Sequence, residues 1–366
     1  MFCSNCGNTI EKATGINKAL LAVSIITTQN NSTNPKRIEW LDIAKGISML
    51  CIVAGHMNSA TVQKIVFTFH VPLFFLISGY LISQKQDYIT FCKNKIRGLI
   101  LPYIYISFLL IILKIPTDIY YDRSQFILED LKNTILSACY GSGSSLNKTI
   151  HGIQPIGAIW FLLALFWALL IVKFFMNKKY GFLVIICIAT ISYISSWYIW
   201  LPWDIQSGGT AAIFVYVGAY IKKKQLKLDV NWLLLFISIL SLVLEFIFNI
   251  QVSVVRNYYK YTVVSIIGAI LISYIVVIFS KMLTKTNLIK RILCFWGENS
   301  LIVLCFHLIE LNNYRWHIFY SNLGDIPLAL KHVICFAIKL IFISLSTYLT
   351  FKTKNYIKKF NGSNVS

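Results

Sequence analysis

The chain has 366 residues, of which 57% are hydrophobic and only 13% are charged, and its mean hydropathy is +0.67. A soluble domain usually carries about 25% charged residues, so this composition excludes an ordinary water-soluble protein. The net charge of +20 comes mainly from short basic runs between apolar blocks. That distribution is typical of membrane proteins and argues against nucleic-acid binding.

Residues 1–36 precede the first apolar block and predict a poorly ordered cytoplasmic leader without a secretory signal peptide. Within it, Cys3 and Cys6 form a CxxC motif that is similar to the first half of a zinc ribbon. No second pair of ligands follows nearby, so we expect no complete metal site within the chain. The other cysteines are scattered, mostly in apolar blocks, and predict no disulfide framework.

Ten apolar segments follow the leader, most of them close to the roughly 20 residues that cross a bilayer. The sixth contains Gly208 and Gly209, and the ninth contains His307 and Glu310, so hydropathy alone supports these two least. The segments are residues 41–60, 65–83, 98–114, 157–175, 181–200, 205–221, 231–249, 261–280, 295–311 and 326–351.

The basic residues between these segments predict the topology. With ten spans and a cytoplasmic N-terminus, most lysines and arginines fall on the cytoplasmic side, as the positive-inside bias requires. Omitting a weak span would place later basic loops outside. We therefore predict an all-α integral membrane protein with ten transmembrane helices and both termini in the cytoplasm. Its membrane domain would comprise residues 37–351, followed by a basic cytoplasmic tail, residues 352–366.

One predicted outer segment, residues 115–156, is long enough to have a function of its own. Its residues 124–138 predict a short amphipathic helix. The segment lies where an acceptor outside the cell would arrive, although a passive cap is an equal alternative.

Polar residues interrupt the first two apolar segments. Lys45 and His56 are 11 residues apart, which is about three helical turns, so they share a helix face about 16 Å apart. Asp42 lies three residues before Lys45, within pairing distance. His56 and His70 flank a short outer turn, and two histidines at one depth suit proton transfer near neutral pH. The alternatives are a lysine that reaches the lipid phosphates and histidines that only fill space.

These segments resemble the membrane-bound acyltransferase family 3, whose members include O-acetyltransferases of bacterial surface sugars. The family's motif is a basic residue followed, after ten other residues, by a histidine. Lys45 and His56 fit this motif directly, and the resemblance extends over residues 37–350. The matching residues are Arg37, Asp42, Lys45, Gly46, Gly55, His56, Phe69, His70, Pro72, Leu73, Phe74, Phe75, Ser78, Gly79, Arg97, Pro102, Trp160 to Leu162, Asn299, Ser300 and His307.

The resemblance implies that acyl-CoA, usually acetyl-CoA, enters from the cytoplasmic side as co-substrate, with no permanently bound cofactor. The acceptor would be a hydroxyl of a cell-surface or lipid-linked carbohydrate, and the location a bacterial inner or plasma membrane in contact with lipid. His56 would act as general base or carry the acyl group, and His70 would assist proton transfer. Ser78 or Asn299 would stabilise the oxyanion of the transition state. The expected substrate-binding residues are Asp42, Lys45, Ser78, Arg97, Asn299, Ser300 and His307.

Two other classes of protein remain compatible with the sequence. A transporter or flippase of a polysaccharide precursor would account for the polar stripe and for Lys339 inside the last span, but we find no internal repeat. An inactive scaffold or sensor is the third reading. The sequence indicates neither the acceptor, the acyl chain nor the oligomeric state.

Overall fold

The computed structural model describes residues 37–57 and 59–362, so the leader and its cysteine pair lie outside the described residues. The described chain is almost entirely helical, and its strands β1 and β2 form one short antiparallel ladder. In chain order the elements are α2 (Glu39–Gly55), α3 (Ala60–Val66), α4 (His70–Tyr80), α5 (Tyr88–Lys95), the π-helix η2 (Ile96–Ile100), α6 (Leu101–Tyr120), η3 (Ser124–Phe126), α7 (Ile127–Tyr140), η4 (Ile150–Gly152), α8 (Trp160–Phe175), α9 (Gly181–Ser195), η5 (Pro202–Asp204), α10 (Ile205–Lys223), α11 (Trp232–Ile247), β1 (Val252–Ser253), η6 (Val254–Arg256), β2 (Tyr258–Tyr259), α12 (Val263–Leu283), α13 (Leu288–Glu298), α14 (Ser300–Asn313), α15 (Trp316–Asn322) and α16 (Leu328–Gly362).

The chain divides into two compact units. The larger unit comprises Ile38–Ser344 and contains every site discussed below. In the smaller unit, the described residues from Leu345 onward form the C-terminal part of α16.

The chain is a multi-pass membrane protein, although the predicted number of ten spans stays a prediction. Within the described residues, four helices are long and apolar enough to cross a bilayer, or five if the bent pair α13–α14 is one span. Every predicted segment contains helix, but α8, α9 and α11 have only 15 or 16 residues, which is short for a full crossing. The long helical stretches are Ala60–Tyr80, Tyr88–Tyr120, Val263–Leu283 and Leu328–Thr353.

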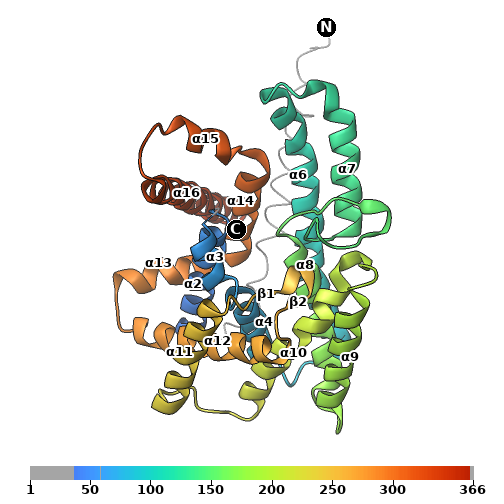
Figure 1. Ribbon diagram of the computed structural model, residues 1–366, viewed down its shortest axis with the longest axis vertical. Helices are drawn as coiled ribbons and strands as arrows, with labels where there is room; N and C mark the ends of the chain where they lie inside the picture. Colours follow the sequence, from blue (N-terminus) through green and yellow to red (C-terminus); the bar gives the residue numbers. More distant parts are fainter. Residues whose placement is uncertain (1–36, 58, 363–366) are drawn as a thin grey trace. The chain divides into compact units, whose positions relative to one another are not determined.

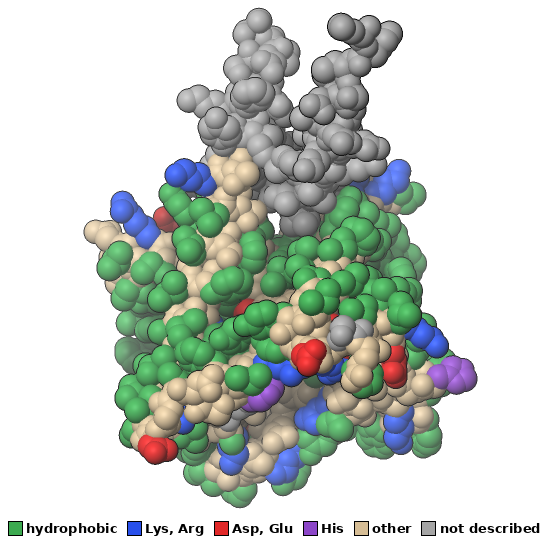
Figure 2. Space-filling view, turned by 90° about the horizontal axis from the view of Figure 1, so that it is seen from above, with side chains coloured by type: hydrophobic (Ala, Val, Ile, Leu, Met, Phe, Trp, Pro, Cys, Tyr) green, Lys and Arg blue, Asp and Glu red, His purple; other side chains and the backbone are tan. Residues whose placement is uncertain are grey.

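The surface also fits a lipid environment. Many large apolar side chains are exposed, among them Trp232 on α11 and Phe279 on α12. Figure 2 shows hydrophobic side chains spread over much of one face, with charged side chains gathered in part of it. Such coverage would be unfavourable in water and is expected where lipid tails surround the helices.

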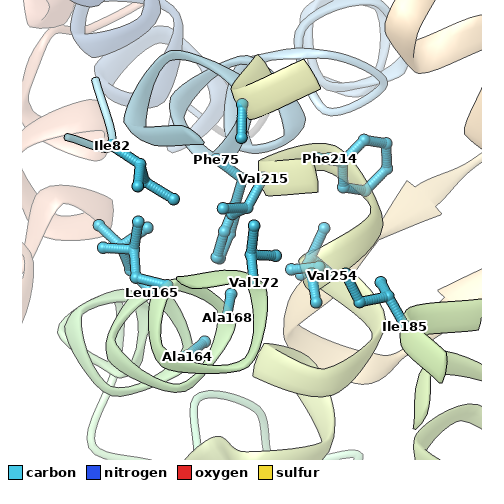
Figure 3. Close-up of a cluster of buried hydrophobic side chains, with 14 of the residues drawn as sticks. Phe75, Ile82, Ala164, Leu165, Ala168, Val172, Ile185, Phe214, Val215 and Val254 are labelled. Atoms are coloured by element: carbon cyan, nitrogen blue, oxygen red, sulfur yellow. The ribbon is translucent and has the colours of Figure 1, made fainter. Parts of the chain in front are cut away.

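The largest buried cluster lies where α4, α8 and α10 pack together, and Figure 3 shows its side chains pointing toward one another. Glycines on α10 allow this close approach. Gly218 lies against the backbone carbonyl of Leu76 on α4, and Gly208 lies against that of Ala164 on α8. A side chain at either position would collide with main-chain atoms. The sixth predicted segment is therefore weakly apolar because its small residues serve helix packing.

The first helix, α2, makes its closest contacts with α13 (Figure 1). Gly46 on α2 lies against the backbone of Leu293, and Gly297 on α13 lies against the carbonyl of Asp42. After Glu298 the chain bends by 77° and continues as α14, which also contacts α2. This bend falls inside the ninth predicted segment and brings α14 alongside the helix that carries Lys45.

The predicted amphipathic helix of the outer segment is confirmed as α7, with bounds shifted by two or three residues. The ion pair between Lys114 and Asp130 joins it to α6, and two further ion pairs lie within α6 and between the connecting turn and α7. Lys114 bonds both Asp118, at 3.1 Å, and Asp130, at 3.5 Å, and Arg123 bonds Asp130 at 3.0 Å. Thr117 on α6 also donates to Asn313 at the end of α14, at 2.7 Å. Residues 115–156, the predicted outer segment, are thus tied to the end of α14 that follows His307.

Candidate active site

Two histidines from distant parts of the sequence meet where the C-terminal end of α2 lies beside the middle of α14. The ring centroids of His56 and His307 are 5.2 Å apart, with the ring planes inclined by 49°. His56 is exposed, whereas His307 is completely buried. The turn that carries His56 is held from both sides, because Gln63 donates to the carbonyl of Gly55 at 2.9 Å and the Tyr320 hydroxyl lies 3.5 Å from the carbonyl of Met57. The accessible imidazole of His56 therefore lies next to the buried imidazole of His307.

His307 is anchored by a carboxylate one turn later on the same helix. Its Nδ1 lies 2.9 Å from Oε1 of Glu310, and both carboxylate oxygens of Glu310 accept from Nζ of Lys339 on α16, at 2.9 Å each. The indole N–H of Trp316 on α15 donates to the other oxygen, Oε2. The ammonium of Lys339 also lies 4.3 Å from the centroid of the Trp316 ring, in cation–π geometry. Each of these contacts stabilises the ionised form of Glu310.

Removing Glu310, Lys339 and His307 from water costs free energy. The exposed fraction is 5% for Glu310 and 1% for Lys339, so the ion pair is almost completely removed from solvent. Paired charges are costly in a membrane bundle, and they are usually retained there for function. His307 adds a further cost, because its Nε2 is buried and has no hydrogen-bond partner among the described residues. That unpaired nitrogen belongs to the ring that faces His56.

The ring of Phe67 contacts both His56 and His70. The centroid of Phe67 is 6.3 Å from that of His56 and 5.3 Å from that of His70. His70 begins α4, is 6% exposed, and its Nδ1 lies 2.5 Å from the carbonyl of Val66. This contact requires Nδ1 to carry a hydrogen, because a carbonyl oxygen can only accept. His56 and His70 therefore share one aromatic neighbour, Phe67.

The predicted pair of Asp42 and Lys45 is present, with Nζ of Lys45 3.3 Å from Oδ1 of Asp42. It lies in the first half of α2, about three turns from His56. Asn299 lies at the same end, because the neighbouring Gly297 touches the backbone of Asp42. Ser300 follows directly and begins α14. These residues form a second group, separated from the histidines by the length of the helices.

Two further predicted residues, Ser78 and Arg97, lie on α4 and η2. Ser78 is half-buried within α4, and Arg97 is exposed in the π-helix η2. The side-chain amide of Asn299 donates to the carbonyl of Phe295 at 2.8 Å and so closes α13 before the bend. His307 lies eight residues further along α14, about 12 Å away. The predicted late segment is therefore divided, with Asn299 and Ser300 at the start of α14 and His307 near its middle.

Our interpretation of the sequence missed the partners of His307. Glu310 counted only as a polar residue in a weak span, and Lys339 only as support for a transporter. Two signals could have identified them. His307 and Glu310 are three residues apart, the spacing at which helical side chains meet, and an isolated lysine inside an apolar helix requires an anionic partner.

Helical architecture, apolar surface and buried charges define the chain as an integral membrane protein with an ionisable site inside its helices. The family model described as an acyltransferase domain, acyltransferase family 3, matches residues 38–352, and the chain therefore belongs to this family. The resemblance seen in the sequence is thereby confirmed. Comparison with curated proteins and with solved structures gives no match. Within the described residues, no group of three or more His, Cys, Asp or Glu side chains is arranged to hold a metal ion.

Proposed function

We propose that this acyltransferase moves an acyl group, specifically acetyl, from cytoplasmic acyl-CoA to a hydroxyl of a cell-surface or lipid-linked carbohydrate in a bacterial cell membrane. One observation carries the proposal. In this member of an acyltransferase family, the ring centroid of the exposed His56 lies 5.2 Å from that of the buried His307, which is hydrogen-bonded to the carboxylate of Glu310. An accessible imidazole with such support is suited to remove a proton from a hydroxyl.

The donor would bind at the basic end of the bundle. Lys93 in α5 and Arg97 in η2 are exposed, and so are four lysines at and just after the end of α10, Lys222 to Lys224 and Lys227. Arginine and lysine bind phosphate through charge-assisted hydrogen bonds, which suits the phosphates of CoA. Asp42, Lys45, Asn299 and Ser300 would line the path of the thioester towards His56. We retain ten spans and cytoplasmic termini as part of this proposal, because they place the basic loops inside.

The chemical step follows from these positions. His56 takes the proton of the acceptor hydroxyl while its oxygen attacks the thioester carbonyl. The intermediate collapses, the carbon–sulfur bond breaks, and His56 returns the proton to the departing thiolate. The alternative course, in which His56 first accepts the acyl group itself, uses the same residue. His70 would assist at the edge of this site.

The experiment is acyl transfer from radiolabelled acetyl-CoA in membranes that contain the protein and surface glycan. We expect label to enter the glycan with wild-type protein and to fall by at least about 100-fold in His56→Ala, because general-base catalysis contributes roughly that much or more. His317→Ala, which removes another exposed histidine, is the matched control and should keep full activity. Substantial transfer by well-inserted His56→Ala would overturn the assigned role.

A transporter or flippase is the second candidate, favoured by the buried pair of Glu310 and Lys339. Its substrate would cross the bilayer without an acyl donor. Absence of CoA-dependent label with every surface glycan offered, from well-inserted wild-type protein, would favour this candidate over the acyltransferase.

A further inference from the structure

We propose that Lys339, Glu310 and His307 form a positioning relay that fixes the tautomer and orientation of His56. The inference rests on the proposed function, because it assigns the support of the same catalytic histidine. Its members come from α14 and α16, and only His56 at its end, on α2, is exposed. The relay thus joins the first helix of the larger unit to its last one.

The proton on His307 can be located from its partners. Glu310 receives hydrogen bonds from Lys339 and from Trp316, so its carboxylate is ionised and can only accept. The nitrogen of His307 that faces Glu310, Nδ1, must therefore carry a hydrogen. In the neutral imidazole the other nitrogen, Nε2, then has a free lone pair.

That lone pair explains the unpaired buried atom. Nε2 of His307 has no partner among the described residues, although it is completely buried and its ring faces His56. A small rotation of the exposed His56 would let one of its ring nitrogens donate to this atom. The second nitrogen of His56 would then hold the lone pair that receives the proton of the acceptor hydroxyl. A buried imidazole and carboxylate are placed to orient the base in this way, as in other chains of nucleophile, base and orienting group.

Lys339 has a different part in the relay. A carboxylate buried alone would take up a proton instead of remaining charged. A protonated Glu310 could donate to Nδ1 of His307 and reverse the direction of every hydrogen bond up to His56. The ammonium of Lys339, 2.9 Å from both oxygens, keeps Glu310 ionised and the direction fixed. Lys339 therefore acts through Glu310 and does not touch the substrate.

The test compares two double variants that both lack the ion pair. In Glu310→Gln with Lys339→Met, the side-chain carbonyl at position 310 can still accept from His307. In Glu310→Leu with Lys339→Met it cannot, and Gln and Leu are similar in size. When the single glutamine oxygen faces His307, Trp316 has lost its acceptor, Oε2, in both variants, so the acceptor for His307 is the feature that separates them.

We expect kcat for acyl transfer within about tenfold of wild type in the Gln double variant and about 100-fold lower in the Leu double variant. KM for acetyl-CoA should be the same in both, because the donor-binding residues lie at the far end of α2. Equal kcat values for the two folded variants would overturn the relay.

A second pair of variants leaves the ion pair in place, in case a double variant fails to fold. His307→Gln keeps an amide that can donate to Glu310 and accept from His56, whereas His307→Leu keeps only bulk. If the relay operates, kcat should be at least about tenfold higher in His307→Gln than in His307→Leu. Equal kcat values in the two variants would contradict it. Wild-type protein that transfers no acyl group would instead disprove the proposed function, so the two failures are distinguishable.

Discussion

The sixth and ninth predicted segments have similarly weak hydropathy, but the structure gives them opposite uses. The sixth became α10, a central helix whose glycines lie against the backbones of α4 and α8. The ninth became the bent pair α13–α14, whose polar residues form a hydrogen-bonded chain around His307. A polar or small residue in an apolar helix therefore serves either close packing or chemistry, and its contacts decide which.

This comparison predicts that the two helices fail differently when they are altered. Changes in α10 should reduce the amount of folded protein and leave the activity of the folded fraction intact. Changes around His307 should reduce the activity of protein that still folds, except where they leave a buried charge without its partner.

The largest effect on stability is expected for that exception. Lys339→Met would leave the carboxylate of Glu310 buried without its cation, which typically costs about 3–5 kcal/mol. Adding Glu310→Gln removes the unpaired charge and should recover most of this loss. Thermal unfolding in detergent measures both variants. A single variant as stable as wild type would show that Glu310 becomes protonated or hydrated at little cost.

A smaller loss of stability is expected from α10. Gly218→Leu would push a side chain into the carbonyl of Leu76, where main-chain atoms cannot yield, at a cost of about 1–3 kcal/mol. The amount of folded protein should fall while the kcat of the purified folded fraction stays at the wild-type value. Phe279→Leu, an exposed apolar change on α12, is the control and should alter stability by less than about 0.5 kcal/mol. Unchanged unfolding of Gly218→Leu would contradict the close approach of α4 and α10.

The sequence predicted the helical membrane fold and one end of the site, and physical reasons explain what it could not supply. Helical periodicity places Asp42 and Lys45 together, since both lie on one helix, and their ion pair is present. Hydropathy could not reveal the bend at Asn299, because the bend depends on packing between Gly297 and α2. Nor could it pair Glu310 with Lys339, because that contact joins residues 29 positions apart in the sequence.

Two roles are predicted along α14, donor binding at Asn299, where the helix begins, and support of the catalytic base at His307. The smallest effect we predict tests whether these two roles are separate. Asn299→Ala removes one hydrogen bond, to the carbonyl of Phe295, so stability should fall by only about 0.5–1.5 kcal/mol. Asn299 lies beside the end of α2 that carries Lys45. We therefore expect Asn299→Ala to raise KM for acetyl-CoA severalfold and to leave kcat little changed. His307→Leu, eight residues away on the same helix, should lower kcat with KM unchanged. Steady-state kinetics of the two variants would therefore show whether α14 binds the donor at its start and supports the base near its middle. If Asn299→Ala lowered kcat with unchanged KM, Asn299 would belong with the histidines, and an oxyanion role would replace donor binding.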